Sequence, residues 1–343
     1  MSKNFAVPQR SRAEELKLLN VFGMPDAGEV VTAENTFGTP FELKAFWLRE
    51  AGDEYHSRTE LSQSQFTKFL REPEIFHDRI LADTIDAEES ADFKFGKEVE
   101  HFLFHDELPG NPVVVPNELL SKRARPDKWF DDQQIERDPN NPDHFVFAKS
   151  GKPYAEFVAA NPGRNILTQK EFDELSGPLN LIRQKIREHD KALPLLYGDS
   201  LRHIAIVFTC PFSGIELRCQ IDILSGRCCI VDYKTAASNN PWQYAYKFDE
   251  FFYHIQATWY REAVRQLTGV TMPVIHVVTE KKSKSYIVEV FNIDDGWFER
   301  GLAEWRVGIA NFQSCVESAS WHRPTHNTIV NLKPPANLVR RSS

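Results

Sequence analysis

The sequence has no long hydrophobic run: none of its 343 residues belong to a stretch of about 18 or more apolar residues. A helix that crosses a membrane needs such a stretch, so the sequence predicts no membrane span. Its start, MSKNFAVPQRSRAEE, also lacks the apolar core of a secretory signal peptide. We therefore expect a cytoplasmic protein.

Cysteine is scarce as well. The chain has five cysteines, and no two of them form a CxxC pair. Zinc ribbons and disulfide-stapled domains use paired, regularly spaced cysteines, so neither is indicated. With 41% hydrophobic residues, the chain instead has enough apolar side chains for a substantial core in one large domain or two smaller ones.

An excess of positive charge is also missing. Lys and Arg total 41 against 49 Asp and Glu, which gives a net charge of -8. This balance argues against a protein held on nucleic acid by bulk positive potential, but it allows an enzyme that contacts phosphates through a local basic patch. The short basic segments SKRARPDK (121–128) and EKKSKS (280–285) are more typical of solvated loops than of binding surfaces.

The segment CQIDILSGRCCIVDYKTA (219–236) combines strand-forming residues with charged ones. Its composition predicts two strands joined by a turn near Gly226. Such a hairpin brings Asp222 close to Asp232, and the alternation of a strand places Lys234 on the same face as Asp232. Two carboxylates about 5 Å apart repel by roughly 3 kcal/mol at an effective dielectric near 20, so they need a compensating cation. A divalent metal ion is the natural candidate.

Strand alternation also predicts a polar face on the first strand of this hairpin. Arg218, Gln220 and Asp222 would share that face, and the intervening apolar residues would share the other. A single Asp at a strand end is usually a turn or solvent residue. The combination of two carboxylates and an ammonium in an apolar run is less easily explained in that way, because an unpaired buried charge is costly.

The order of the expected elements is helices, antiparallel strands, a helix, strands and a final helix, which indicates an α+β core. Thr168 is expected to cap one helix and Gly269 to end another. Residues 109–165 are rich in proline, asparagine and charge and are expected to be a partly irregular excursion. The expected helices cover residues 61–81, 91–108, 167–193, 251–269 and about 294–315.

Five short signals follow one another along the chain. They are Ser62 with Ser64, Gly96 with Glu100, Asp222 alone, Asp232 with Lys234, and Gln256 with Tyr260. In type and order they closely resemble the PD-(D/E)XK nuclease superfamily, in the branch of RecB-like nucleases, exodeoxyribonuclease VIII and lambda-type exonucleases. The resemblance covers roughly residues 54–323.

This resemblance implies a restriction-endonuclease-like α+β core, with a mixed β-sheet flanked by helices. We expect residues 1–54 to be an N-terminal extension of unknown role. Residues 55–323 would form the nuclease domain, with an insertion around 109–165. Residues 324–343 would form a flexible tail.

The resemblance also implies the roles of the site residues. Glu100, Asp222, Asp232 and the backbone carbonyl of Tyr233 would bind Mg2+, for which Mn2+ would substitute. Lys234 would orient or deprotonate the attacking water or steady the developing charge, and Gln256 would bond the water or the phosphate. DNA contacts are expected from Ser62, Ser64, Arg218, Gln220 and Tyr260, although the serines could equally cap a helix and Tyr260 could belong to the core.

Two positions depart from the pattern of the relatives. At the position where exodeoxyribonuclease VIII relatives usually have His, this chain has Glu100, followed by His101. Lambda-type exonucleases carry Glu at that position. Glu100 is therefore the favoured metal ligand, and His101 is the alternative. Relatives often have Arg two residues before the first Asp. Gln220 occupies that place here, and Arg218 lies one pleat away.

The implied activity is Mg2+-dependent hydrolysis of DNA, as an exodeoxyribonuclease on the ends of linear double-stranded DNA in recombination or repair, and of phage or prophage origin. The resemblance further implies a homo-oligomer, and a single-strand annealing recombinase as a partner. The alternatives are an endonuclease of the same superfamily and a catalytically inactive DNA-binding or assembly module.

Overall fold

The computed structural model describes residues 12–49, 55, 57–81, 91–134, 136 and 145–322. The chain divides into two compact units. The first, here called the small unit, comprises residues 1–9, 90–190 and 279–288, and the second, here called the sheet unit, comprises residues 10–89, 191–278 and 289–343. The predicted flexible tail, residues 324–343, lies outside the described residues. The predicted domain boundaries stay a prediction.

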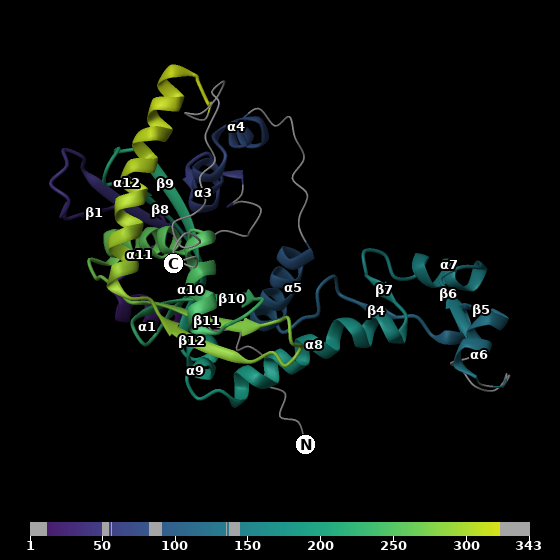
Figure 1. The fold of residues 1–343 in the computed structure, drawn as a ribbon. Coiled ribbons are helices and arrows are strands. Elements are labelled where there is room, and N and C mark those ends of the chain that lie inside the picture. The colour runs from purple at the N-terminus through teal and green to yellow at the C-terminus, as the bar shows by residue number, and fades with distance from the viewer. Residues whose placement is uncertain are drawn as a thin grey trace, which may run out of the picture. The chain divides into compact units, whose positions relative to one another are not determined.

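The sheet unit is organised around a mixed β-sheet with the strand order β1-β2-β8-β9-β10-β11-β12, and β3 pairs with β9 beside this path (Figure 1). The β3–β9 pair is parallel, whereas β1–β2, β2–β8, β8–β9 and β9–β10 are antiparallel. The predicted mixed sheet with flanking helices is therefore confirmed. The strands are β1 (Val31–Ala33), β2 (Leu43–Leu48), β3 (Leu61–Ser62), β8 (Ser200–Thr209), β9 (Glu216–Ser225), β10 (Cys229–Ala236), β11 (Val274–Glu280) and β12 (Val288–Asn292).

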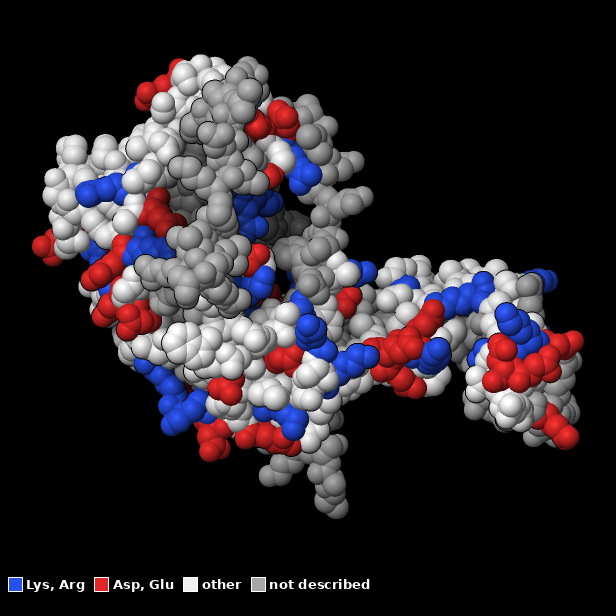
Figure 2. Space-filling view, in the orientation of Figure 1, with Lys and Arg blue, Asp and Glu red and all other residues white. Residues whose placement is uncertain are grey.

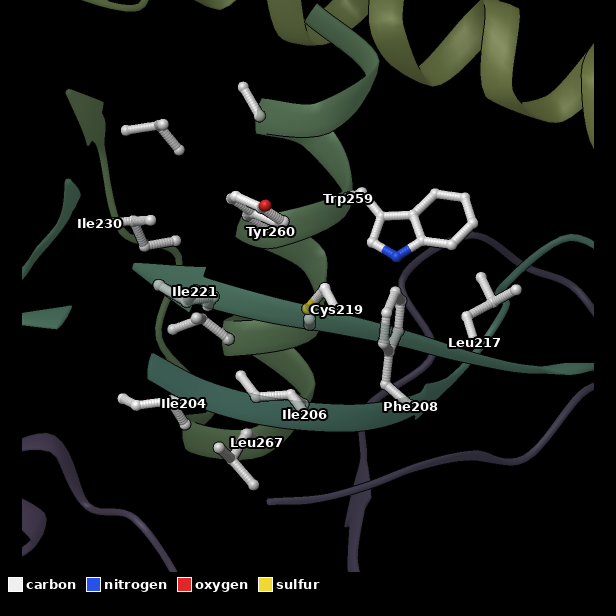
Figure 3. Packing of buried hydrophobic residues seen from close by; sticks show 14 of the residues in the cluster. Ile204, Ile206, Phe208, Leu217, Cys219, Ile221, Ile230, Trp259, Tyr260 and Leu267 are labelled. Carbon is white, nitrogen blue, oxygen red and sulfur yellow. The ribbon is translucent and has the colours of Figure 1, made fainter. Parts of the chain in front are cut away.

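Helix α11 packs on the sheet mainly through apolar side chains, and the amide of its Gln266 donates to the carbonyl of Thr209 on β8 at 2.9 Å. Figure 3 shows Trp259, Tyr260 and Leu267 of this helix against side chains of β8 and β9. Trp259 is fully buried, and burying a large apolar side chain contributes roughly 1.5–3 kcal/mol. The helices of the sheet unit are α1 (Arg12–Phe22), α3 (Gln63–Arg71), α4 (Pro73–Phe76), the π-helix η1 (His77–Leu81), α9 (Ala192–Tyr197), α10 (Pro241–Glu250), α11 (Tyr253–Thr268) and α12 (Asp295–Ser318).

The N-terminal segment contributes two strands to this sheet. Strand β2 pairs with β8 from Ala45 opposite Phe208 to Leu48 opposite Ala205. Trp47 is buried in the core, and its indole nitrogen donates to the carbonyl of Pro25 at 2.8 Å. The described part of residues 1–54 therefore completes one side of the sheet, which the sequence did not suggest.

The small unit contains more regular structure than expected over residues 109–165. Thr168 caps α8 as predicted: its hydroxyl accepts from the backbone N–H of Glu171, and the Glu171 carboxylate accepts from the N–H of Thr168 at 2.7 Å. Arg183 ties α8 to α5 through an ion pair with Asp106 at 2.5 Å. The elements are α5 (Ala91–His105), β4 (Val113–Val114), the 3-10 helix η2 (Asn117–Leu119), β5 (Ser121–Ala124), α6 (Asp127–Gln133), β6 (Phe145–Ala148), α7 (Lys152–Ala159), β7 (Ile166–Leu167) and α8 (Gln169–Glu188).

Charge is mixed over the face of the molecule shown in Figure 2, where Lys and Arg are interspersed with Asp and Glu. This pattern agrees with the net charge of -8. Within the described residues, no helix is both long and apolar enough to span a membrane.

Gly301 allows α12 to approach α11 closely. A Cβ atom at this position would lie 2.3 Å from Oγ1 of Thr258 and 2.4 Å from the carbonyl oxygen of His254. We expect Gly301→Ala to lower the free energy of unfolding by about 1–3 kcal/mol, because the two helices must move apart. Urea denaturation measures this loss.

A matched control is Gly177→Ala, also within a helix, where the added Cβ would meet no atom within 4 Å. That variant should lose less stability than Gly301→Ala, because the helix preference of alanine offsets the crowding of its Cβ against Pro178, the next residue. Equal stabilities of the two variants would contradict the close approach of α11 and α12.

Candidate active site

The hairpin of β9 and β10 brings the two predicted aspartates together. Val231 lies opposite Ile223 in the antiparallel register, so the next pair of positions is Asp232 and Asp222. The backbone N–H of Tyr233 donates to Oδ2 of Asp222 at 3.3 Å, which places this carboxylate against β10 beside Asp232. The local hairpin alone is therefore sufficient to juxtapose the two acids.

Lys234 neutralises part of this negative charge. Its Nζ lies 2.6 Å from Oδ2 of Asp232, and the two side chains are only 17% and 2% exposed. Burial by itself would lower the pKa of Lys234, but the Asp232 carboxylate, with smaller contributions from Tyr253 and Asp222, raises it overall. Lys234 is therefore a cation, which the sequence alone could not decide.

The predicted alternation of β9 is interrupted near Asp222. Ile221 and Leu224 are three residues apart, yet both belong to the same hydrophobic core. In β8, Arg202 pairs with Ile223 and Ile204 with Ile221, and the intervening His203 has a left-handed φ of 50°. A non-glycine residue with this conformation is uncommon within a strand. The irregularity therefore lies directly opposite Asp222 and breaks the continuous polar face that the sequence predicted.

Arg218 is not available for the predicted DNA contact. It is buried, and its guanidinium donates to the carbonyl oxygen of Glu60 at 2.8 Å and to that of Tyr55. It also lies over the Tyr55 ring, 4.6 Å from the centroid. These contacts give Arg218 a structural role in holding Tyr55 and Glu60, which argues against the expected phosphate contact. Gln220 is half-buried, and its predicted DNA contact stays a prediction.

Ser62 and Ser64 form the start of α3. Ser62 is buried and makes a capping box with Gln65, in which its hydroxyl accepts from the Gln65 N–H at 3.2 Å. The two serine hydroxyls lie 3.2 Å apart, and Ser64 is exposed. Ser62 therefore caps the helix, which is the alternative role predicted for these serines. A DNA contact from Ser64 stays a prediction.

Gln256 and Tyr260 are held together on α11. The side-chain nitrogen of Gln256 donates to the Tyr260 hydroxyl at 3.1 Å and to Oε1 of Gln63 at 3.4 Å. Burial, reinforced by the negative charges of Asp232 and Asp222, raises the pKa of Tyr260 well above its usual value. Tyr260 is buried in the core, so packing is one of its functions.

Sequence reasoning missed His276 on β11 and Tyr244 on α10. Both are buried, and the Tyr244 hydroxyl lies 2.8 Å from Nδ1 of His276, whose Nε2 lies 3.6 Å from Oδ2 of Asp232. Burial lowers the pKa of His276 to about 4, against the attraction of Asp232, so the imidazole is neutral at pH 7. The available signal was a histidine at an inward position of the apolar strand VIHVVTE.

Glu100 and the alternative ligand His101 lie on α5, in the small unit, and both are half-buried. The carbonyl of Tyr233 belongs to β10, next to Asp232. The parts of Glu100, His101 and this carbonyl in a metal site stay predictions.

A family model, the PDDEXK-like domain of unknown function DUF3799, matches residues 62–328, well over half of the chain. The chain belongs to this PDDEXK-like family. The matched range begins at the capping Ser62 and includes the Asp222, Asp232 and Lys234 cluster. Membership in the PD-(D/E)XK superfamily, predicted from the five signals, is thereby confirmed.

The fold of the PDDEXK-like chain is similar to a crystal structure from Eubacterium rectale described as a "putative exonuclease". The TM-score is 0.52 at 13% sequence identity, and the match covers 85% of this chain and 98% of the other. At this identity the likeness establishes the fold alone. No curated protein matches the chain.

The PDDEXK-like site has two carboxylates, a type of ligand that hard divalent ions prefer. Oδ2 of Asp232 is paired with the ammonium of Lys234, and the buried Oε1 of Gln256 has no hydrogen-bond partner in the described part of the chain. A buried oxygen without a donor is costly, and a water coordinated by a metal ion would donate to it. Among the described residues, no three or more His, Cys, Asp and Glu side chains are placed to hold a metal ion together, so Asp222 and Asp232 form a partial ligand set.

His276 in the PDDEXK-like site is expected to position Asp232. We expect His276→Leu to weaken Mn2+ binding by about 10- to 100-fold, because the Asp232 carboxylate loses its polar neighbour on β11. His276→Gln, whose amide nitrogen can take the place of Nε2, should retain most of the affinity. Calorimetric titration with Mn2+ measures both variants.

The matched control for this experiment is Tyr244→Phe, which keeps the ring and removes only the hydroxyl that contacts His276. It should fall between the wild type and His276→Leu. Wild-type affinity in His276→Leu would show that the imidazole is only a packing residue.

Proposed function

We propose that this chain is a metal-dependent deoxyribonuclease that hydrolyses linear double-stranded DNA from its ends. The observation that carries the proposal is the cluster of Asp222, Asp232 and Lys234 on the β9–β10 hairpin, with the Asp232–Lys234 pair buried and 2.6 Å apart. Family membership places this cluster in a nuclease superfamily. Action at DNA ends is inferred from the resemblance of the five sequence signals to exonucleases, and the chain shares its fold with a structure described as a "putative exonuclease".

Asp222 and Asp232, with Glu100 and the Tyr233 carbonyl as proposed further ligands, would hold Mg2+, for which Mn2+ would substitute. The bound ion would neutralise phosphate charge and lower the pKa of a coordinated water. Lys234, whose Nζ lies 2.6 Å from Oδ2 of Asp232, would stabilise negative charge that develops on the attacked phosphate, or orient or deprotonate the attacking water. Oε1 of Gln256, which has no partner among the described residues, would accept a hydrogen bond from the attacking water.

The partners of the proposed nuclease follow from the resemblance. They are the ends of double-stranded DNA, a single-strand annealing recombinase and further copies of the chain in a ring-like oligomer. Recombination or repair of DNA in the cytoplasm, in a phage or prophage context, is the corresponding setting. The mixed surface charge in Figure 2 implies that DNA would be bound through local contacts rather than a large positive field.

The experiment is a comparison of DNA substrates. Purified protein is incubated with linear, nicked circular and closed circular DNA, each with Mg2+ and with EDTA. Metal-dependent loss of the linear substrate alone would support the exonuclease. Cleavage of closed circles would identify an endonuclease, and binding without cleavage in any metal condition would identify an inactive module.

A further inference from the structure

Helix α10 carries two aromatic side chains on its solvent face. Trp242 is 81% exposed and Tyr246 is 74% exposed. Four residues apart in a helix, they lie on the same side, with Cβ atoms about 5–6 Å from each other. Their neighbours Gln243 and Lys247 are also exposed, so the two rings stand among polar groups. Two large aromatic rings exposed next to each other are unusual on a protein surface and indicate a binding site.

The opposite face of α10 contacts the candidate active site. Tyr244 and Phe248 are buried, and the Tyr244 hydroxyl lies 2.8 Å from His276, the neighbour of Asp232. The helix begins at Pro241, soon after Lys234 at the end of β10, with Asn240 as its N-cap. One short helix thus joins the catalytic cluster on its inner face to the exposed rings on its outer face.

Cations and a further ring follow at the end of α10. Phe251 is 42% exposed, and Arg71 and Lys247 each lie 5.6 Å from its centroid. The next residue, Phe252, has a φ of 56°, a strained conformation for a bulky side chain that tends to persist at functional sites. The surface from Trp242 to Phe251 therefore combines aromatic faces with the cations of Arg71 and Lys247, of which Lys247 is also paired with Glu250 at 2.6 Å.

This combination is complementary to single-stranded nucleic acid. Aromatic rings stack on bases of any type, and cations contact the phosphates between them. A hydrophobic interface with a second copy would instead need a continuous apolar patch, whereas polar and charged residues surround these rings.

We propose that Trp242 and Tyr246 stack on unpaired bases of a DNA strand at the catalytic hairpin, so that the substrate is preferentially an end with a single-stranded overhang. This inference rests on the proposed nuclease function and names its substrate class. Loss of both rings is expected to weaken binding of single-stranded DNA by at least tenfold, while binding of a blunt duplex changes little.

The test measures the binding of fluorescein-labelled oligothymidylate and of a blunt duplex by fluorescence anisotropy, with Ca2+ in place of Mg2+. The full-length wild type is compared with the Trp242→Ala/Tyr246→Ala double variant. The matched control is Trp242→Phe/Tyr246→Phe, which keeps both rings and should bind oligothymidylate within about threefold of the wild type. As an independent measure, oligothymidylate should quench wild-type tryptophan fluorescence more than that of Trp242→Phe.

Two results would overturn the inference. The first is equal binding of oligothymidylate by the wild type and the alanine variant. The second is a change of oligomeric state in the alanine variant, measured by light scattering, which would identify this face as an interface between copies of the chain. Cleavage assays with Mg2+ separate the two proposals. If the wild type cleaves DNA and the alanine variant keeps the same preference for overhangs, only the inference is wrong. If the wild type binds through the rings but never cleaves DNA, only the nuclease function is wrong.

Discussion

Asp232→Asn should reduce Mg2+-dependent DNA hydrolysis by at least about 10²- to 10³-fold. Asparagine has nearly the same shape but no charge, so the variant loses the anionic oxygen beside Lys234 without opening a cavity. Hydrolysis of linear DNA under single-turnover conditions measures the chemical step. The melting temperature in EDTA shows whether the variant is folded.

A suitable control for this substitution is Asp295→Asn. Asp295 is 88% exposed in the first turn of α12. Its ion pair is with Arg261 of α11, and neither residue belongs to the β9–β10 hairpin. Exposed pairs contribute little, so this variant should keep wild-type activity and stability. Near-wild-type hydrolysis by Asp232→Asn would rule out the proposed site.

Lys234→Met should abolish activity and also destabilise the metal-free protein by about 3–5 kcal/mol. The substitution removes the ammonium and leaves Asp232 buried without its cation, which costs more than removal of both partners. The Asp232→Asn/Lys234→Met double variant should therefore be more stable than Lys234→Met alone. Urea denaturation in EDTA measures the three proteins.

Metal provides a second measure for the lysine variant. A ligand that binds only the folded state raises its stability, and a divalent ion would replace the missing positive charge beside Asp232. Mg2+ should therefore raise the melting temperature of Lys234→Met more than that of the wild type. A Lys234→Met protein as stable in EDTA as the wild type would show that the pair has no stabilising role.

Much of the β9–β10 hairpin could be predicted because its determinants are local. Asp222 and Asp232 are ten residues apart and joined by a short turn, so a strand pattern and a turn signal suffice to place them together. The caps at Thr168 and Gly269 were predictable for the same reason, since a cap depends on residues within one helical turn.

Arg218 shows where local reasoning failed. Its position on the predicted polar face assumed that β9 alternates without interruption. The irregularity opposite Asp222 depends on His203 of β8, and the carbonyls that bind Arg218 come from Tyr55 and Glu60, more than 150 residues earlier in the chain. The addition of β1 and β2 to the sheet and the contact of His276 with Asp232 likewise require distant strands to pair.

The placement of two carboxylates and a lysine on one hairpin, and of a glutamine and a tyrosine one turn apart on a helix, could be predicted from the amino-acid pattern. These features were readable because strand alternation, turns and helical spacing act over a few residues. The pairing of Lys234 with Asp232, the structural role of Arg218 and the position of His276, 3.6 Å from Asp232, were known only from the structure. Each of these depends on burial and on pairing between distant segments, which are set by the whole fold rather than by neighbouring residues.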